Sequence, residues 1–246
     1  PVVLAHRIVR EFSACRQSSY TQGILPDGKA QVTVEYENGK PVRLDSVVVS
    51  CQHTEDKNLK KLEAEIRKKV LLPALRLLPP DEDTKIFINP SGRFVCGGMD
   101  ADTGLTGRKL MVDSYGSMVP HGGGAFSGKD CSKVDRSVAF MARYIAKNIV
   151  AARLASRCQV SLAYAIGVAQ PVMVQVDTFG TGKVCADDCL ELAIPLVFGL
   201  TPKQIVDSLR LTRPIFRQTA AFGHFGRKEF PWERTDKVEA LRNAVI

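Results

Sequence analysis

The feature that most constrains the fold is a pair of strand patterns joined by a tight turn. Apolar and polar residues alternate over Ala30–Tyr36, as in a strand with one buried face. Asn38-Gly39 follows, a dipeptide that favours the two-residue turn of a β-hairpin because both residues tolerate positive φ. Val42–Ser50 then predicts the returning strand, in which Val47-Val48-Val49 indicates burial on both faces. An antiparallel hairpin is therefore expected.

A helix and a third strand are predicted after this hairpin. Four apolar residues recur at helical spacing: Leu59, Leu62, Ile66 and Val70. We therefore predict a helix that begins near Glu55 and is ended by Pro73. Lys85–Ile88 reads as a short strand, and the turn residues Asn89–Gly92 end it.

The second half of the chain follows this order loosely. A strand is predicted over Lys109–Val112, then a glycine-rich loop, then a helix from about Lys133 to Arg157. One face of this helix is apolar, and the opposite face carries Arg136, Arg143 and Lys147. The pattern then predicts two strands, Gln159–Val168 and Val172–Thr178, and two short helices, Asp187–Phe198 and Pro202–Leu211.

This order of elements predicts an α+β fold. The repeated β-β-α-β pattern indicates two units from a duplication, each with helices on one face of a sheet. The boundary is expected near Phe94–Gly97, which divides the chain into residues 1–95 and 96–246. The first residue is Pro1 rather than Met, so we expect the chain to begin inside a longer protein.

Composition limits the class of protein. The 246 residues are 45% hydrophobic and 24% charged, as in ordinary globular proteins. The sequence contains no run of about 20 apolar residues, so it predicts no membrane-spanning helix. The seven cysteines form no CxxC pair, which argues against zinc and against a disulfide framework and favours a cytoplasmic location. The net charge of +8 suits an anionic partner, and it leaves open both nucleic-acid binding and a basic surface without a partner.

The most informative segment is the glycine-rich stretch Gly122–Asp130. Gly123 and Gly128-Lys129 have the spacing of a P-loop, but Asp130 stands where a P-loop needs Ser or Thr to hold magnesium. The preceding residues also make a poor buried strand, so we reject a P-loop NTPase. Glycines still let backbone N–H groups approach an anion, and the lysine supplies charge. Spacing alone leaves open phosphate binding and a flexible loop.

Asp135 has two interpretations. Ser132-Lys133-Val134-Asp135 fits a capping box, with Ser132 as the N-cap and Asp135 satisfying a backbone N–H. Alternatively, Asp135 is a metal ligand at a helix N-terminus that faces phosphate. Both can hold only if different carboxylate oxygens serve the two roles.

Two other segments carry charge. Asp102 precedes the paired Arg108-Lys109, which by itself is typical of a solvated loop. The tail Thr219–Arg227 is rich in aromatic and small residues, and no acidic residue occurs from Ser208 to Lys228. We favour packing of this tail over anion binding.

Four segments together resemble the methionine adenosyltransferase (S-adenosylmethionine synthetase) family. They are Asn89–Phe94, Gly104–Lys109, Gly122–Asp130 with Ser132–Arg136, and Phe222–Arg227 with Phe230–Glu233. The nonapeptide Gly122–Asp130 is a signature of the family, and the resemblance extends from about Leu4 to Lys237.

The resemblance implies a fold of three similar α+β domains around a pseudo-threefold axis, of which this chain supplies the rest of the central domain and the C-terminal domain. It implies S-adenosylmethionine synthesis from ATP and L-methionine, by attack of sulfur on C5′ of ATP and later hydrolysis of tripolyphosphate to phosphate and pyrophosphate. It also implies Mg²⁺ and K⁺ as cofactors and a homodimer, often doubled to a homotetramer, with active sites between subunits. Neither a nucleic acid nor a membrane is an expected partner.

The resemblance assigns roles to matched residues. ATP would contact Asp27, Lys29, Arg93, Phe94, Asp102, Arg108, Lys109, Ala125 and Lys129. Methionine would contact Asp102 and Lys133, and magnesium would bind Asp135. Arg108, Lys129 and Lys133 would act in catalysis, because cationic groups stabilise the charge that accumulates on a leaving polyphosphate.

The sequence departs from the family in two ways. Met99-Asp100-Ala101 differs from the usual stretch before Asp102. The family's Gly-His-Pro-Asp-Lys and Gly-Ala-Gly-Asp-Gln segments, and its glutamates for potassium and methionine, do not occur in these 246 residues. We therefore expect the chain by itself to be inactive, and a catalytically incomplete fragment or a regulatory, partner-binding subunit remains the alternative.

Overall fold

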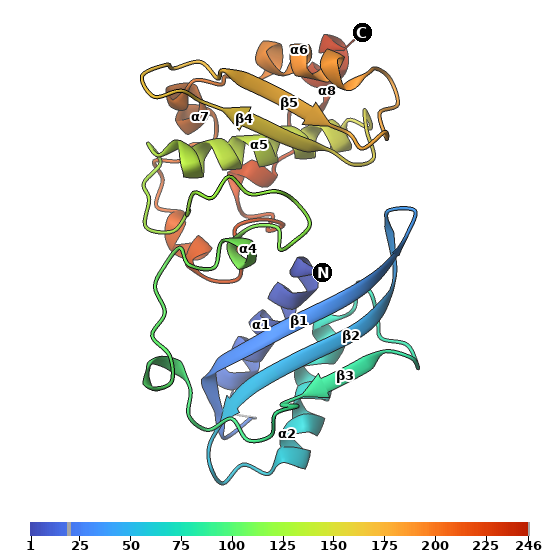
Figure 1. Ribbon diagram of the computed structural model, residues 1–246, viewed down its shortest axis with the longest axis vertical. Coiled ribbons are helices and arrows are strands. Elements are labelled where there is room, and N and C mark those ends of the chain that lie inside the picture. The colour runs from blue at the N-terminus through green and yellow to red at the C-terminus, as the bar shows by residue number, and fades with distance from the viewer. Residues whose placement is uncertain (19–20, 246) are drawn as a thin grey trace. The chain divides into compact units, whose positions relative to one another are not determined.

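The computed structural model of the chain describes residues 1–18 and 21–245 (Figure 1). The chain divides into two compact units, unit 1 (Pro1–Leu105) and unit 2 (Thr106–Ile246), and each has its own hydrophobic core. Both units combine helices with a small sheet, so the predicted α+β class is confirmed.

Unit 1 is built on a three-stranded sheet. Its elements are α1 (Val2–Gln17), β1 (Ile24–Glu37), β2 (Lys40–His53), α2 (Leu59–Ile66), the π-helical turn η1 (Arg67–Leu71), α3 (Leu72–Ala74), β3 (Lys85–Ile88) and the 3₁₀ turn η2 (Gly98–Asp100). The sheet order is β1-β2-β3, with β1 and β2 antiparallel and β2 and β3 parallel. The predicted hairpin and third strand are confirmed, and both hairpin strands extend beyond the predicted residues.

Helix α1 was not predicted, although its sequence has apolar residues at helical spacing. Leu4, Ile8, Phe12 and Cys15 recur every three or four residues, and all four are buried. The helix lies against β1, where the Phe12 ring leaves so little space that a Cβ on Gly28 would lie 3.1 Å from it. Figure 1 shows α1 and α2 on the same side of the sheet.

The helix predicted after the hairpin forms, but it is not regular. Asn58 caps α2, because its side chain accepts a hydrogen bond from the Lys61 N–H. The helix passes into the π-helical turn η1 directly before the short helix that contains Pro73. Proline has no N–H for the preceding turn, and a π-helical turn is one way to accommodate the missing bond.

Unit 2 surrounds one long helix. Its elements are α4 (Leu110–Asp113), α5 (Val134–Ala151), β4 (Gln159–Ala163), β5 (Met173–Asp177), α6 (Asp187–Val197), α7 (Pro202–Ser208), the 3₁₀ turns η3 (Phe216–Ala220) and η4 (Pro231–Glu233), and α8 (Val238–Ala244). β4 and β5 form an antiparallel pair, as predicted.

The strand predicted over Lys109–Val112 is wrong, because these residues lead into helix α4. The Asp113 N–H donates to the Lys109 carbonyl, and the Ser114 N–H and hydroxyl both donate to the Leu110 carbonyl. The apolar run was too short to distinguish a strand from a helix by periodicity. In the described part of unit 2, the strand pair therefore has no third strand beside it.

The basic face predicted for α5 is partly covered by other parts of unit 2. Arg136 is only 3% exposed, and Arg143 and Lys147 bond the carboxylate of Glu233, whose side chain is fully buried. The tail Thr219–Arg227 and the turn η4 that follows it cover this face: Thr219 accepts a hydrogen bond from Arg136, and Phe140 stacks on Trp232 at 3.8 Å between ring centroids. The tail therefore packs, as we predicted, and α5 is the central core helix of unit 2.

No single helix in the described residues has the length and apolar character needed to cross a membrane. Within residues 1–18 and 21–245, only α6 and α7 taken together reach that length and composition, and they are bent by 76° to each other.

Candidate functional site

The glycine-rich loop of unit 2 lies before α5 and brings a cation and a carboxylate together. The Lys129 ammonium group donates to Asp135 Oδ2 at 2.6 Å. Asp135 lies in the first turn of α5, where the helix N-terminus favours negative charge. Two of the predicted site residues are therefore paired.

Gly124 lets this pair approach the loop. A Cβ on Gly124 would overlap the carboxyl group of Asp135, so any other residue would displace one of them. The loop backbone and the carboxylate are thus in direct contact, a geometry available only to glycine at this position.

The segment Thr106–Lys109 lies close to the glycine-rich loop. A Cβ on Gly107, whose φ is +74°, would lie 2.7 Å from the Ala125 Cβ. This close approach brings the start of the Arg108-Lys109 pair beside Ala125, and both basic side chains are exposed. Four predicted site residues, Arg108, Lys109, Ala125 and Lys129, therefore lie on two adjoining loops.

The predicted capping box at Ser132 is wrong. The N-cap of α5 is Lys133, and no side chain caps the helix there. Asp130 instead accepts the Ser132 N–H at 2.7 Å, and hydrogen bonds from the Ser132 side chain and backbone hold the pKa of Asp130 below its usual value. Lys133 is exposed and lies 3.9 Å from Asp130. Asp135 is therefore free of a capping role and pairs with Lys129.

Arg136 is a residue of this site that sequence reasoning missed. Its guanidinium donates to the Lys129 carbonyl and to Thr219 Oγ1, and lies 3.8 Å from the centroid of the Phe216 ring. Burial lowers its pKa to about 10. Helical periodicity placed Arg136 opposite the apolar face, and only the packing of the tail shows that it is buried.

Unit 1 holds the other predicted residues around the end of β2. Leu25, Pro26 and Asp27 form a bulge in β1, because Ile24 pairs with His53 while Gly28 pairs with Cys51. Asp27 Oδ2 accepts the Gly98 N–H at 2.8 Å. Lys29 follows on β1 and is exposed.

Arg93 and Phe94 are fixed on the other side of β2. The Arg93 guanidinium donates to the Glu55 carbonyl at 2.7 Å. Phe94 is half-buried, and its N–H donates to His53 Nε2 at 3.1 Å. Asp102 is exposed, and its N–H donates to the Gly98 carbonyl. Asp27 and Asp102 therefore both bond Gly98.

A divalent metal fits unit 2 only in part. No three His, Cys, Asp or Glu side chains gather as metal ligands in residues 1–18 and 21–245. Mg²⁺ needs only one or two carboxylates when phosphate oxygens supply other ligands. Asp135 beside the glycine loop suits that donor set, and the Lys129 ammonium group already lies against its carboxylate. No described group was assigned to K⁺.

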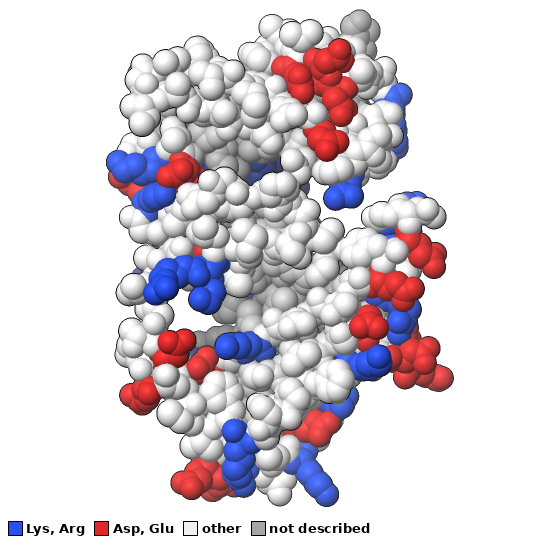
Figure 2. Space-filling model, in the orientation of Figure 1, with Lys and Arg blue, Asp and Glu red and all other residues white. Residues whose placement is uncertain are grey.

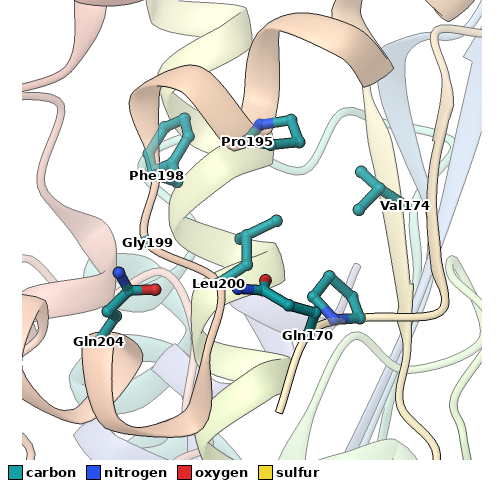
Figure 3. Close-up of a pocket in the computed structure, with 8 residues that line it drawn as sticks. Gln170, Val174, Pro195, Phe198, Gly199, Leu200 and Gln204 are labelled. Atoms are coloured by element: carbon teal, nitrogen blue, oxygen red, sulfur yellow. The ribbon is translucent and has the colours of Figure 1, made fainter. Parts of the chain in front are cut away.

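A cavity of ≈ 330 Å³ opens elsewhere in unit 2 (Figure 3). Pro195, Phe198 and Leu200 line it beside Val174, and the carboxamides of Gln170 and Gln204 provide its polar groups. None of the predicted site residues belongs to its lining.

Comparison with known proteins gives the family. The sequence model described as "S-adenosylmethionine synthetase, central domain" matches residues 1–94, and that described as "S-adenosylmethionine synthetase, C-terminal domain" matches residues 96–234. An S-adenosylmethionine synthase from Treponema denticola is 54% identical over 248 residues, covering 100% of this chain. This chain spans 63% of that relative's length. The chain therefore belongs to the S-adenosylmethionine synthetase family.

Proposed function

We propose that this chain is the part of a methionine adenosyltransferase that carries its central and C-terminal domains, in a fold with three such domains around a pseudo-threefold axis. The complete enzyme would make S-adenosylmethionine from ATP and L-methionine. Membership of the family supports this reaction in general. The observation that carries the proposal is the Lys129–Asp135 pair against Gly124, because a loop lysine beside a lone carboxylate at a helix N-terminus suits a polyphosphate and its metal.

The proposed chemistry is a displacement at carbon followed by hydrolysis. The methionine sulfur donates a lone pair to C5′ of ATP and becomes a sulfonium. The C5′–O bond breaks, and its electron pair leaves with tripolyphosphate. Water then cleaves tripolyphosphate to phosphate and pyrophosphate.

In this proposal the basic residues of unit 2 bind the leaving polyphosphate. Lys129, Lys133 and Arg108 stabilise its negative charge, and Lys109 and the backbone at Ala125 complete the contact. Lys129 and Arg108 lie on adjoining loops, which supports a shared anion. Mg²⁺, when bound, neutralises phosphate charge, and Asp135 would hold it.

The residues of unit 1 would bind the nucleoside end of ATP and the amino acid. Phe94 packs on the base, with Arg93, Asp27 and Lys29 as further ATP contacts. Asp102 touches both ATP and methionine, and Lys133 of unit 2 also contacts methionine. Support for a common role comes from Gly98, to which both Asp27 and Asp102 bond.

Assembly and location complete the proposal. The enzyme would be a homodimer, doubled to a homotetramer, with active sites between subunits, and would also use K⁺. We place it in the cytoplasm, an assignment supported by the seven free thiols. On the face drawn in Figure 2, basic side chains are interspersed with acidic ones, and we propose no nucleic-acid partner.

A second candidate function is a non-catalytic binding subunit. The lone carboxylate at the metal position favours it, because a magnesium site with only Asp135 depends on ligands from elsewhere. Such a subunit would bind ATP or a partner protein and release no product.

The reaction products distinguish the synthase from the non-catalytic binding subunit. The purified complete protein would be given ATP, L-methionine and Mg²⁺, and S-adenosylmethionine, phosphate and pyrophosphate would be measured. The synthase produces the three in equal amounts. Lys129→Met should lower the rate about 100- to 1,000-fold, as expected for loss of one preorganised charge-stabilising group. ATP binding without any of the three products would instead favour the binding subunit.

A further inference from the structure

Two consecutive side chains at the end of β2, Gln52 and His53, connect the separate segments of the unit 1 site. Gln52 is 8% exposed and His53 is fully buried. Neither belongs to the ATP contacts proposed above. Each makes hydrogen bonds to segments that are distant in sequence.

Gln52 joins the β1 bulge to the segment after Phe94. Its Oε1 accepts the Asp27 N–H at 3.2 Å, and its Nε2 donates to the Val95 carbonyl at 3.0 Å. The bulge sets Leu25, Pro26 and Asp27 opposite Gln52 alone, so the Asp27 N–H has no regular strand partner. The carboxamide supplies the missing acceptor, as a buried backbone N–H requires.

His53 fixes Phe94 through both polar atoms of its backbone. The Phe94 N–H donates to His53 Nε2, and the His53 N–H donates to the Phe94 carbonyl at 2.9 Å. Because Nε2 accepts, the proton of the neutral ring lies on Nδ1, which donates to the Thr54 carbonyl at 2.9 Å. Every hydrogen-bonding atom of this buried ring is therefore in use.

Gly97 completes the arrangement. A Cβ at this position would lie 2.7 Å from Gln52 Cδ and 2.9 Å from the Phe94 ring carbon Cε2. The carboxamide, the aromatic ring and the Gly97 backbone therefore lie against one another. The position of the Phe94 ring depends on Gln52 as well as on His53.

We propose that Gln52 and His53 are positioning residues for nucleotide binding, which set the Phe94 ring and the Asp27 carboxylate in the arrangement that receives the nucleoside of ATP. This inference rests on the proposed function, since it takes ATP as the ligand. Neither residue needs to touch ATP. A misplacement of about 1 Å in a positioned group can cost about 100-fold in rate, so indirect support of this kind has a measurable effect.

The test uses two substitutions of His53 in the complete protein. In His53→Gln, the longer carboxamide places its oxygen near the position of Nε2 and keeps an acceptor for Phe94. In His53→Asn, the shorter carboxamide reaches only the position of Nδ1 and leaves the Phe94 N–H without its acceptor. We expect the dissociation constant for ATP to rise about tenfold in His53→Asn, the equivalent of about 1.4 kcal/mol for one lost hydrogen bond. His53→Gln should restore most of the affinity.

Two substitutions of Gln52 provide a parallel test. Gln52→Leu removes both hydrogen bonds and should weaken ATP binding about tenfold or more. Gln52→Glu keeps the acceptor for Asp27 but loses the donor to Val95, so it should fall between Gln52→Leu and the wild type. The KM for methionine should not change in either variant.

The control is Thr84→Val, at the start of β3. The Thr84 hydroxyl hydrogen-bonds the Leu44 carbonyl at 2.9 Å and also the N–H and carboxylate of Asp81, so this change removes hydrogen bonds of unit 1 that involve neither Asp27 nor Phe94. It should lower thermal stability without changing ATP affinity. Hydrogen exchange of the peptide containing Phe94 should quicken in His53→Asn and stay unchanged in His53→Gln.

The two possible failures are distinct. If the wild-type protein binds no ATP, the proposed function is wrong. If the wild type binds ATP, and His53→Asn and Gln52→Leu bind it equally well, the positioning role is wrong. Equal losses in His53→Asn and His53→Gln would also overturn it, because the retained acceptor would then be irrelevant.

Discussion

Arg136 gives unit 2 a buried positive charge beside Lys129. Among the described residues, no carboxylate lies within ion-pair distance of its guanidinium, and its Nε atom has no hydrogen-bond partner there. A buried cation is costly unless something compensates it, and the Phe216 ring and two oxygen acceptors do so only in part. The remaining positive potential acts on the same loop as Lys129, which favours an anion there.

Asp135 allows a sharp test of the metal assignment. The Lys129–Asp135 ion pair is half exposed, with side-chain exposures of 31% and 51%, so its loss should cost no more than about 1 kcal/mol of stability. Mg²⁺ binds through few carboxylates and is sensitive to the loss of one. In the complete protein, Asp135→Asn should therefore leave the thermal midpoint nearly unchanged, raise the magnesium requirement and lower the rate sharply. Thermal unfolding and a magnesium titration of the rate would measure both.

Ser132→Ala is the control for this substitution. Ser132 is not the N-cap of α5, so the variant should change neither stability nor magnesium dependence much. If Asp135→Asn destabilises the fold and spares magnesium-dependent activity, the metal role of Asp135 is wrong.

At the residue scale, the contacts of the candidate site were predictable from sequence only where a local motif indicated them, and the roles of these residues stay predictions. The glycines and Lys129 were recognised because their spacing is itself the signal. Ser132 satisfied a capping pattern but lost that role because Asp130 takes its N–H. Arg136 gave no signal, because its burial depends on Phe216 and Thr219, about 80 residues away.

At the scale of elements, two glycines of the glycine-rich loop, Gly124 and Gly122, differ in whether a neighbouring residue leaves room for a side chain. A Cβ on Gly124 would overlap Asp135, whereas a Cβ on Gly122 would meet nothing within 4 Å. Gly124→Ala should therefore lower the free energy of unfolding by about 1–3 kcal/mol, as overpacking does. Gly122→Ala should leave it unchanged or raise it by about 0.4–1 kcal/mol through the unfolded state. Denaturant unfolding would measure both, and equal effects would contradict the contact.

Helix α5 and the tail are joined by a buried carboxylate. Burial alone raises the pKa of Glu233, but the hydrogen bonds and charges of Arg143 and Lys147, with the Gly226 N–H, outweigh it and hold the pKa below its usual value. A carboxyl group whose pKa is lower in the folded than in the unfolded state stabilises the fold, and this contribution is fully present at pH values above the unfolded-state pKa of about 4.3. This stability is lost as pH falls through the folded-state pKa.

Glu233→Gln should therefore destabilise unit 2 in a pH-dependent way. At pH 7 we expect a loss of roughly 2–3 kcal/mol, below the full cost of breaking a buried pair because both cations keep some exposure. The difference from the wild type should shrink as pH falls below about 4. Fluorescence of Trp232, the only tryptophan, would follow unfolding. Glu229→Gln is the control, because Glu229 is 46% exposed and its pair with Arg227 is worth little. A constant difference at all pH values would contradict this account.

Most elements were predictable from hydrophobic periodicity and from the turn residues at their ends. The β1–β2 hairpin, β3, α5, the β4–β5 pair, α6 and α7 all appear near their predicted residues. Helix α4 was mistaken for a strand because four apolar or charged residues carry no usable period. The burial of the charged face of α5 was not predicted, because helical periodicity indicates one apolar face, whereas this helix packs against β4, α7, η4 and α8.

At the scale of the whole chain, Cys96–Leu105 connects the two units. The C-terminal family model begins at residue 96, whereas unit 1 extends to Leu105. Hydrogen bonds explain the difference, because Gly98 bonds both Asp27 and Asp102 and so holds this segment to unit 1. The predicted domains, residues 1–95 and 96–246, stay a prediction.

The last prediction concerns activity of the 246-residue chain by itself. In the proposed site Asp135 is the single carboxylate assigned to magnesium, and no three potential ligands gather among the described residues. Electrostatic stabilisation requires a complete preorganised set, and the loss of one donor already costs about 100- to 1,000-fold. The chain alone should therefore form no measurable S-adenosylmethionine, while circular dichroism shows that it is folded. The complete protein, assayed in parallel, should form product. Steady synthesis by the folded 246-residue chain would show that these two units already contain every group the reaction needs.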